Sequence, residues 1–263
     1  MIVAVIPARM SSSRFPGKPM ALIRGIPMVG HVLHRTSFCS AFDDIWVATC
    51  DPVIDDYVKS IGGKSVLTGN HHERASERVT EAVEKIEAKT NYKIDHVAMI
   101  QGDEPLVMPE MLEELVQPAL AGDSAAVINL IQKISSDEEF LSPDIVKLVR
   151  KPSGEVIYFS REPIPSKKKY KEQYKRWKQL GLILFRRDAL FDFIKLQPTP
   201  LEIIESVDMN RFIEHGRVIK TVETVFQTYS VDTPKDLQNV EMHFERDPWF
   251  TRYQKVTGLN EGK

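Results

Sequence analysis

The chain has 263 residues, of which 42% are hydrophobic, a length that allows one large α/β domain or two small ones around a sizeable buried core. Its 35 Lys and Arg and 37 Asp and Glu residues give a formal net charge of −2, which excludes a general attraction to nucleic acid or to anionic membranes. The two cysteines, Cys39 and Cys50, stand in no zinc-ligand spacing, and neither a signal-peptide pattern nor a run of 18 apolar residues occurs, so we expect a cytoplasmic protein with no integral membrane association.

The first half of the chain alternates between short apolar runs and amphipathic stretches. The runs predict strands at residues 2–6, 45–48, 64–67, 96–100 and 125–130, and the stretches predict helices at residues 28–40, 53–61, 73–88 and 110–120. This alternation is typical of an α/β fold with a doubly wound, mostly parallel central sheet and helices on both faces. Ligands of such sheets bind at the carboxyl ends of strands, so the loops after Ile6 and Ile100 are the first candidates for a site.

The second half has a different pattern. Residues 145–149 and 155–159 are predicted to pair as strands around a Pro-Ser-Gly turn, and residues 180–185 are predicted to form a buried strand. The segment 166–178 (SKKKYKEQYKRWK) is too charged to form a core, and it is either a solvated loop or helix face or a mobile flap over an anionic substrate. The aromatic tail after Asp247 is expected to pack, within the chain or on a partner subunit.

The loop after the first strand, PARMSSSRFPGKP (residues 7–19), combines small residues with cations. Small residues such as Ser13 let backbone N–H groups approach phosphate oxygens, and Arg9, Arg14 and Lys18 supply the positive charge that a triphosphate requires. The loop matches neither GxxxxGK[ST] nor GxGxxG, which argues against a Walker loop and a Rossmann cofactor site. An ordinary surface turn can have the same composition, so the residues alone leave both interpretations open.

Two aspartates are candidate metal ligands. Asp103 lies in a QGDEP turn directly after an apolar strand, and Asp232 follows the apolar-patterned segment 226–231 and precedes a helix that begins with proline. Mg²⁺ takes oxygen ligands, commonly one or two carboxylates with water and substrate phosphate. Each aspartate alone is equally suited to a turn or a helix cap. Glu104 and Asp236 are weaker candidates and are expected to be loop and helix-surface residues.

The run IPARMSSSRFPGKPM resembles the nucleotide-binding signature of the 3-deoxy-manno-octulosonate (Kdo) cytidylyltransferases, I-P-A-R-x-x-S-[ST]-R-[FL]-P-G-K-P. The resemblance continues in the family's order at the segments QGDEP, YFSR, PxPLE and VDTPxDL, and it covers nearly the whole chain. It implies a nucleotide-diphospho-sugar transferase-like fold, CTP and an acidic keto-sugar as substrates, Mg²⁺ as cofactor and a homodimer. It also implies a single domain over residues 1–263, with a nucleotide-binding half to about residue 130, a sugar-binding and dimerisation half to about residue 245, and a tail at 246–263.

Carried over residue by residue, the resemblance assigns catalytic roles to Lys18, Asp103 and Asp232, with the two aspartates as the metal ligands. The nucleotide-binding residues that it implies, beside Lys18, are Ala8, Arg9, Ser13, Arg14, Ser76, Arg78 and Gln101. Arg161, at the end of the YFSR strand, matches the family's sugar-side arginine, which suits a carboxylate. Arg211 is a further but weaker candidate for the same side.

The sequence departs from the family pattern on the predicted sugar side. Gln179 stands where typical members have His, Asp208-Met209 stands where they have Glu-Gln, and Arg74-Ala75-Ser76 replaces Ser-Gly-Thr beside the nucleotide. Gln179, Asp208 and Met209 are therefore predicted sugar-binding residues that alter acceptor choice, in favour of a modified octulosonate with an amino or deoxy carbon. The alternative is that these substitutions are drift without effect.

Two other functions remain open at this point. The chain could transfer CMP to another sugar acid, such as a nonulosonate, although it lacks the Gly-Ser-Lys-rich loop of acylneuraminate cytidylyltransferases, or it could be a catalytically silent homologue. The histidines form no HExxH pair, and the pair His71-His72 is predicted to be a surface turn and not a metal site.

Overall fold

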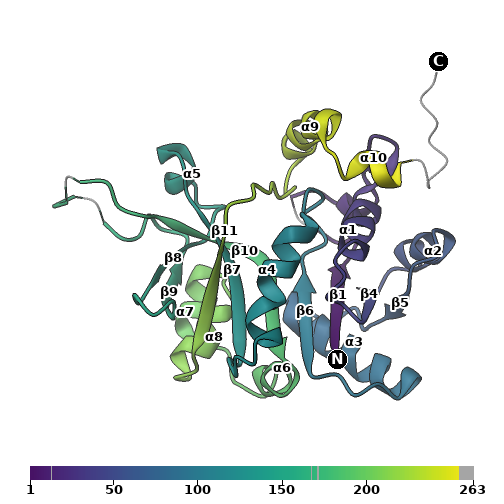
Figure 1. Ribbon diagram of the computed structural model, residues 1–263, viewed down its shortest axis with the longest axis horizontal. Helices are drawn as coiled ribbons and strands as arrows, with labels where there is room; N and C mark the ends of the chain where they lie inside the picture. Colours follow the sequence, from purple (N-terminus) through teal and green to yellow (C-terminus); the bar gives the residue numbers. More distant parts are fainter. Residues whose placement is uncertain (13, 167, 171, 255–263) are drawn as a thin grey trace. The chain divides into compact units, whose positions relative to one another are not determined.

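In the computed structural model the first apolar run forms β1 (Ile2–Ala8) (Figure 1). This strand is buried along its whole length. β1 pairs in parallel with β4 (Asp44–Thr49) on one side and with β6 (His96–Ile100) on the other, and β5 (Ser65–Leu67) pairs in parallel with β4. A central parallel strand has neighbours at both edges and packing on both faces, so nearly every position must be apolar. The sequence IVAVIPA meets that demand without alternation.

The structure describes residues 1–263 except 13, 167, 171 and 255–263, and the chain divides into two units. The first unit comprises Met1–Glu113 and Thr228–Lys263, and the second comprises Glu114–Gln227. The first unit is therefore built from two separate stretches of chain, and α4 (Pro109–Leu120) runs across the boundary.

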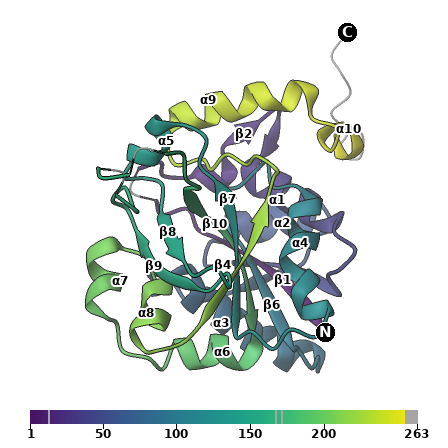
Figure 2. The same cartoon turned by 60° about the vertical axis from the view of Figure 1, so that its left-hand side comes forward.

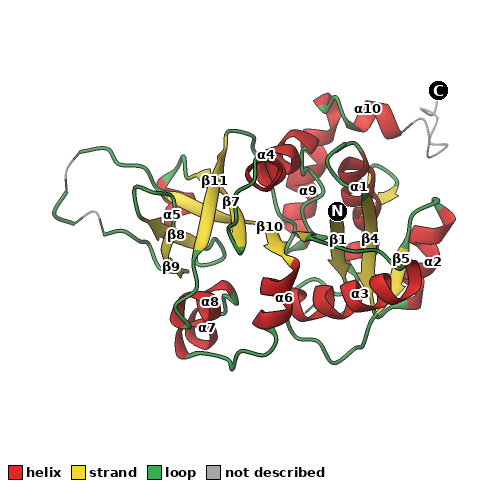
Figure 3. Cartoon of the chain, turned by 60° about the horizontal axis from the view of Figure 1, so that its bottom comes forward, coloured by secondary structure: helices red, strands yellow, loops and turns green. Residues whose placement is uncertain are grey.

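Helices cover both faces of the parallel strands in the first unit. α1 (Met28–Ser37) connects β1 to β4, and α2 (Pro52–Ser60) connects β4 to β5, so these strands follow one another toward one edge of the sheet. α3 (Ala75–Thr90) connects β5 to β6, which pairs with the other side of β1. Because parallel crossovers are right-handed, a reversal of direction moves the connecting helix to the other face. Figure 3 shows α1 and α3 on opposite sides of β1 and β4. The predicted doubly wound arrangement is confirmed in this unit.

The second unit contains a mixed set of strands. β7 (Val127–Lys133) pairs in parallel with β11 (Ile219–Thr224) and antiparallel with β10 (Trp177–Arg186). β10 also pairs antiparallel with β8 (Lys147–Arg150), which pairs antiparallel with β9 (Val156–Ser160). The predicted strand pair at 145–149 and 155–159 is confirmed as β8 and β9, and the buried strand predicted at 180–185 is the inner part of a longer β10.

Four short helices and β11 were not predicted from the sequence. The helices are α5 (Asp137–Leu141), α6 (Arg187–Phe193), α7 (Pro200–Glu205) and α8 (Met209–Glu214). Figure 2 shows α7 and α8 beside the β8–β9 hairpin. Asn210 fixes α8 to that hairpin, because its amide nitrogen donates to the Phe159 carbonyl at 3.1 Å and its oxygen accepts from the Phe159 amide at 3.2 Å.

The C-terminal segment packs on α1 within its own chain. It consists of α9 (Pro234–His243), the 3-10 helix η2 (Phe244–Arg246) and α10 (Phe250–Tyr253). Arg35 of α1 has no exposed surface and pairs with Asp247 at 2.8 Å, and the ring of Phe38 lies 5.1 Å from that of Trp249. Among the described helices, none is both long and apolar enough to span a bilayer.

His31, on α1, is enclosed by this packing. Its Nε2 lies 2.8 Å from the Ile23 carbonyl and its Nδ1 lies 2.8 Å from the Tyr253 hydroxyl. Because a carbonyl only accepts, Nε2 carries the proton and Nδ1 accepts from the tyrosine. Burial, together with the nearby charge of Arg35, lowers the pKa of His31 to about 3 in spite of the opposing effect of the Ile23 hydrogen bond.

This burial predicts a pH-dependent loss of stability. The unfolded chain binds a proton at His31 below about pH 6.5, whereas the folded chain does so only near pH 3, so the free energy of unfolding should fall between those values, by about 2 kcal/mol at pH 5. Urea unfolding at pH 7 and pH 5 measures this difference. In His31→Gln the difference should shrink by that amount, whereas His215→Gln, at an exposed histidine, should retain it. Equal differences in all three proteins would contradict the assignment.

Candidate active site

A hydrogen bond between backbone groups closes the loop after β1. The Gly17 amide donates to the Met10 carbonyl at 2.8 Å, and Gly17 has a φ of +79°, a conformation that favours glycine. Asp51, at the start of α2, accepts a hydrogen bond from the Met10 amide at 2.8 Å. The chain then enters the 3-10 helix η1 (Lys18–Met20). These bonds fix the point at which the Lys18 side chain leaves the backbone.

The QGDEP turn after β6 lies against the end of β1. A Cβ at Gly102 would lie 2.8 Å from the Pro7 carbonyl oxygen, closer than Cβ atoms approach, so only glycine allows this approach. Glu104 is buried and accepts a hydrogen bond from the Thr228 hydroxyl at 2.6 Å. It joins the turn to the segment that returns from the second unit, which is a structural role.

The first turn of α9 holds the backbone of Asp232 in place. The Asp236 carboxylate accepts hydrogen bonds from the amides of Asp232, at 3.1 Å, and Thr233, at 2.8 Å. The Thr233 side chain accepts from the Asp236 amide at 3.2 Å, which completes a capping box, and Pro234 occupies the first helical position. Asp236 is therefore a capping residue, and it orients the backbone of Asp232.

Lys18 joins these three segments. Its Nζ donates to Asp103 Oδ2 at 2.7 Å, to the Val231 carbonyl at 3.0 Å and to Asp232 Oδ1 at 3.1 Å. The Val231 amide in turn donates to the Asp103 carbonyl at 2.9 Å, and Arg14 Nη2 lies 3.0 Å from Asp232 Oδ1. We call Arg14, Lys18, Asp103 and Asp232 the charge cluster. It comes from positions more than 200 residues apart in the sequence.

The charge cluster is partly screened from water. The Lys18 side chain is 14% exposed, and those of Asp103 and Asp232 are 27% and 28% exposed. Burial by itself would lower the pKa of Lys18, but the charges and hydrogen bonds of Asp103 and Asp232 outweigh burial and raise it. Two carboxylate oxygens and a carbonyl oxygen converge on one cation here, and this is a donor set that suits Mg²⁺.

The other predicted nucleotide-binding residues lie in the same unit. Ala8 ends β1 and Gln101 follows β6, so both lie at the carboxyl edge of adjacent parallel strands. Arg9 is exposed and its Nη1 donates to the His72 carbonyl at 3.2 Å. Ser76 and Arg78, in the first turns of α3, are buried, and Ser13 lies outside the described residues.

Arg78 holds the loop before α3. Its Nη1 donates to the Gly69 carbonyl at 3.2 Å and to the Thr68 hydroxyl, and its side chain is almost fully enclosed. These contacts assign Arg78 a role in shaping residues 68–69. Its predicted contact with a nucleotide stays a prediction.

The predicted sugar-side arginine lies in the second unit. Arg161 Nε donates to the Glu205 carbonyl at 2.8 Å and Nη1 to the Pro143 carbonyl at 3.0 Å, bonds that do not involve Nη2. The Glu205 carboxylate accepts from the Arg161 amide at 2.7 Å, from the Tyr158 hydroxyl at 2.7 Å and from the Ser160 hydroxyl at 2.9 Å. Burial alone would raise the pKa of Glu205, but these bonds lower it. Sequence reasoning missed Glu205.

Gln179 and Met209, the two departures, differ in accessibility. The Gln179 amide is part-exposed and donates to Asn129 Oδ1 at 2.8 Å. Asn129 is buried, and its own amide donates to the carbonyls of Leu180 and Leu182 in the irregular part of β10. Met209 has no exposed surface, and Asp208 is part-exposed at the N-cap of α8. An Asn within the apolar run VINLI could have indicated a buried polar contact, but the sequence does not identify Gln179 as its partner.

Arg211 is held inside the second unit. Its Nε and Nη2 donate to the two oxygens of Glu202 at 2.6 and 2.5 Å, its guanidinium lies 4.4 Å from the centre of the Phe193 ring, and both charged side chains are buried. A bidentate pair of this kind fixes α8 to α7. Arg211 therefore has a structural role in this unit, and its sugar-side assignment stays a prediction.

Comparison with known proteins supports the motif assignment. A family model described as Cytidylyltransferase matches residues 3–219. The 3-deoxy-manno-octulosonate cytidylyltransferase of Geobacter metallireducens is 39% identical over 249 residues, with 91% of this chain and 96% of that protein covered. The enzyme of the same name from Myxococcus xanthus is 39% identical over 239 residues, with coverages of 91% and 94%.

Solved structures resemble this one over most of its length. A CMP:2-keto-3-deoxy-manno-octonic acid synthetase complexed with CTP gives a TM-score of 0.85 at 35% identity, covering 93% of this chain and 98% of that chain. A glucose-1-phosphate thymidylyltransferase from Bacillus anthracis, described as putative, gives a TM-score of 0.65 at 15% identity, covering 95% and 99%. The second similarity extends to the fold alone.

Proposed function

We propose that this chain, which belongs to the 3-deoxy-manno-octulosonate cytidylyltransferase family, transfers CMP from CTP to the anomeric hydroxyl of a Kdo-type sugar acid and releases pyrophosphate. The observation that carries the proposal is the charge cluster, in which the cationic loop after β1 meets two carboxylates from separate segments. The proposal includes Mg²⁺ as cofactor, a homodimer and a reaction in the cytoplasm, as the family resemblance implies.

The charge balance of the cluster explains why a metal ion would be needed. Arg14 and Lys18 contribute two positive charges and Asp103 and Asp232 two negative charges, so the cluster by itself is neutral. A neutral cluster does not attract a polyanion such as CTP. Asp103 and Asp232 would hold Mg²⁺, which when bound stabilises negative charge on the transferred phosphoryl group and favours ionisation of the attacking hydroxyl.

The chain's own cations would then act on the phosphates. Lys18 and Arg14 already lie within 3.1 Å of Asp232, so both could reach a triphosphate bound to a metal ion that the two aspartates hold. Arg9 adds a further exposed cation on the loop after β1. Positive groups at these positions would orient the triphosphate and stabilise the pyrophosphate that leaves.

Pyrophosphate release tests the function directly. With Mg²⁺ and a panel of sugar acids that includes Kdo, modified octulosonates and a nonulosonate, CTP should support turnover well above ATP, GTP and UTP. Equal turnover with every nucleotide would contradict the cytidylyl assignment. A nonulosonate as the best acceptor would favour the rival sugar acid, and no turnover with any acceptor would favour a catalytically silent homologue.

Removal of one carboxylate charge should have opposite effects on binding and catalysis. In Asp103→Asn or Asp232→Asn the cluster gains a net charge of about +1, so CTP without Mg²⁺ should bind about fivefold more tightly, from roughly 1 kcal/mol of added attraction. Turnover with Mg²⁺ should fall by about 100-fold or more, because a metal ligand is lost. Calorimetry with CTP in EDTA and steady-state kinetics measure the two quantities.

A matched control separates charge at this site from charge elsewhere. Asp188→Asn removes an aspartate of the second unit that is 61% exposed and pairs with Arg186. It should change neither CTP affinity in EDTA nor turnover. If Asp103→Asn and Asp232→Asn keep near-normal Mg²⁺-dependent turnover, neither residue is a metal ligand.

Acceptor choice should depend on Gln179 and little on Met209. Gln179 remains neutral at every pH, so it tolerates an ammonium that a protonated histidine would repel. The enzyme should therefore use 8-amino-Kdo with a kcat/KM about tenfold above that for Kdo, equivalent to roughly 1.4 kcal/mol. Gln179→His should reduce that ratio, and Gln197→His, at an exposed glutamine of the same unit, should leave it unchanged.

Met209→Gln provides the contrast. Met209 is fully buried, so a polar replacement should lower the free energy of unfolding by about 1–3 kcal/mol and leave the acceptor ratio unchanged. If Kdo is the better acceptor and Gln179→His does not alter the ratio, the plain Kdo assignment stands.

A further inference from the structure

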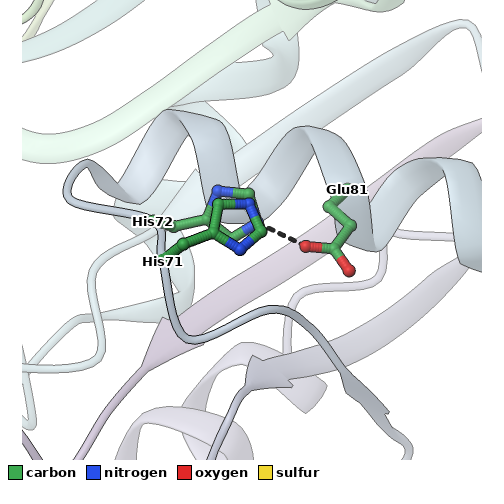
Figure 4. A group of neighbouring side chains, drawn as sticks. All are labelled: His71, His72 and Glu81. Atoms are coloured by element: carbon green, nitrogen blue, oxygen red, sulfur yellow. Dashed lines mark hydrogen bonds and ion pairs between the residues drawn. The ribbon is translucent and has the colours of Figure 1, made fainter.

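A group of possible metal ligands lies outside the charge cluster, on the loop between β5 and α3. Figure 4 shows the rings of His71 and His72 beside the carboxylate of Glu81, which projects from α3. One ligand atom from each of the three residues lies within 4.8 Å of the others. The ring centroids of the two histidines are 4.2 Å apart, and His72 Nε2 is hydrogen-bonded to Glu81 Oε2. His71 is exposed and the other two are part-exposed.

Gly69 makes room for the exposed histidine. A Cβ at this position would lie 2.4 Å from Cε1 and 2.5 Å from Nδ1 of His71, and 3.4 Å from Glu81 Oε2. Any other residue would push the imidazole away or force it to rotate. The glycine has no positive φ, so backbone strain does not account for it. Its small size therefore has a specific effect, which is to seat the His71 ring beside Glu81.

Two further partners orient the Glu81 carboxylate. The Gly69 amide donates to Glu81 Oε2 at 2.9 Å, and Lys85 Nζ lies 2.7 Å from Oε1. Hydrogen bonds of this kind commonly orient the carboxylate ligands of metal sites. Lys85 also donates to the Leu67 carbonyl at 2.8 Å and its side chain is 49% exposed, so it can move away from an incoming cation while keeping a partner.

The donor types discriminate between metals. Two imidazoles and one carboxylate are a donor set that Zn²⁺ accepts, with a fourth position for water, whereas Mg²⁺ prefers oxygen ligands throughout. Tetrahedral coordination at bonds of about 2.1 Å places ligand atoms about 3.4 Å apart. The ligand atoms of His71, His72 and Glu81 now lie within 4.8 Å of one another. They would reach the tetrahedral spacing if the His72–Glu81 hydrogen bond lengthened and the His71 ring moved toward the other two side chains.

We propose that His71, His72 and Glu81 form a Zn²⁺ site that fixes the loop before α3. The bound ion would link residues 71–72 to α3 directly, beside the bonds that Arg78 and Gly69 already make. The carbonyl of His72 accepts from Arg9, so the site also fixes the backbone on which one cation of the loop after β1 rests. This site is distinct from the charge cluster and does not depend on the proposed reaction.

Calorimetric titration of the chelator-treated full chain with ZnCl₂, together with the visible spectrum of the Co²⁺ form, tests the proposal. Wild type should bind one equivalent of Zn²⁺, and its Co²⁺ form should show the intense absorption of a four-coordinate nitrogen and oxygen site. His71→Ala, Glu81→Gln and Gly69→Ala should each weaken this binding by about tenfold or more, in keeping with the loss of a ligand or its support.

Three controls define the outcome. His215→Ala removes an exposed histidine of the second unit and should bind Zn²⁺ as wild type does. Asp103→Asn should do the same, because Asp103 belongs to the charge cluster. Thermal unfolding without metal should show that His71→Ala is folded. The proposal is overturned if His71→Ala binds Zn²⁺ like wild type, if Asp103→Asn abolishes binding, or if wild type binds no stoichiometric Zn²⁺.

Discussion

The ion pairs of Lys18 organise the first unit. The Lys18 ammonium, on the loop after β1, donates hydrogen bonds to two segments that are far apart in the sequence, the turn after β6 and the segment before α9. Without a cation between them, Asp103 and Asp232 would repel each other in a partly screened environment, which is costly. Asp232 reaches Lys18 because the chain returns to the first unit at Thr228 after forming the second. The folding topology and the candidate chemistry therefore depend on the same contact.

An apolar cluster gives this contact its support. Val231, next to Asp232, packs with Ile23, Leu106, Val240 and Phe244, and Phe15 of the loop after β1 and Phe250 of α10 pack against the same group. The loop that carries Arg14 and Lys18 and the segment that carries Asp232 therefore share one core. On α1, Arg35 pairs with Asp247 and His31 bonds to Tyr253, and these contacts fix the C-terminal segment to the same core. The C-terminal segment, which contributes no residue to the charge cluster, positions it through packing.

Most of the first unit could be predicted from the sequence because central parallel strands are apolar at nearly every position. The second unit was harder. β11 (IKTVET) is only partly buried and mixes polar residues with apolar ones, and α5 to α8 have five to seven residues each, too few for a helical period to stand out. Pairings across long separations, such as Gln179 with Asn129 or Arg211 with Glu202, follow from the fold and leave no local pattern. The pair His71-His72 was predicted to be a surface turn because the histidines form no HExxH pair, and the sequence does not show that Glu81, on the following helix, is their partner.

Both candidate cation sites carry their own counter-charge. Lys18 and Arg14 together neutralise Asp103 and Asp232, and Lys85 neutralises Glu81, so the acidic groups do not need a metal for the chain to fold. The two lysines differ in how easily a metal ion can displace them from the carboxylates. Lys85 is largely exposed and has the Leu67 carbonyl as a second partner, whereas Lys18 is 14% exposed and bonded on three sides. A metal at the histidine site therefore has to displace only a solvated side chain. At the charge cluster, Mg²⁺ would compete with a part-buried ammonium, and a triphosphate would supply the negative charge that Lys18 needs as a new partner. Mg²⁺ and nucleotide should consequently bind to the charge cluster together more favourably than either binds alone.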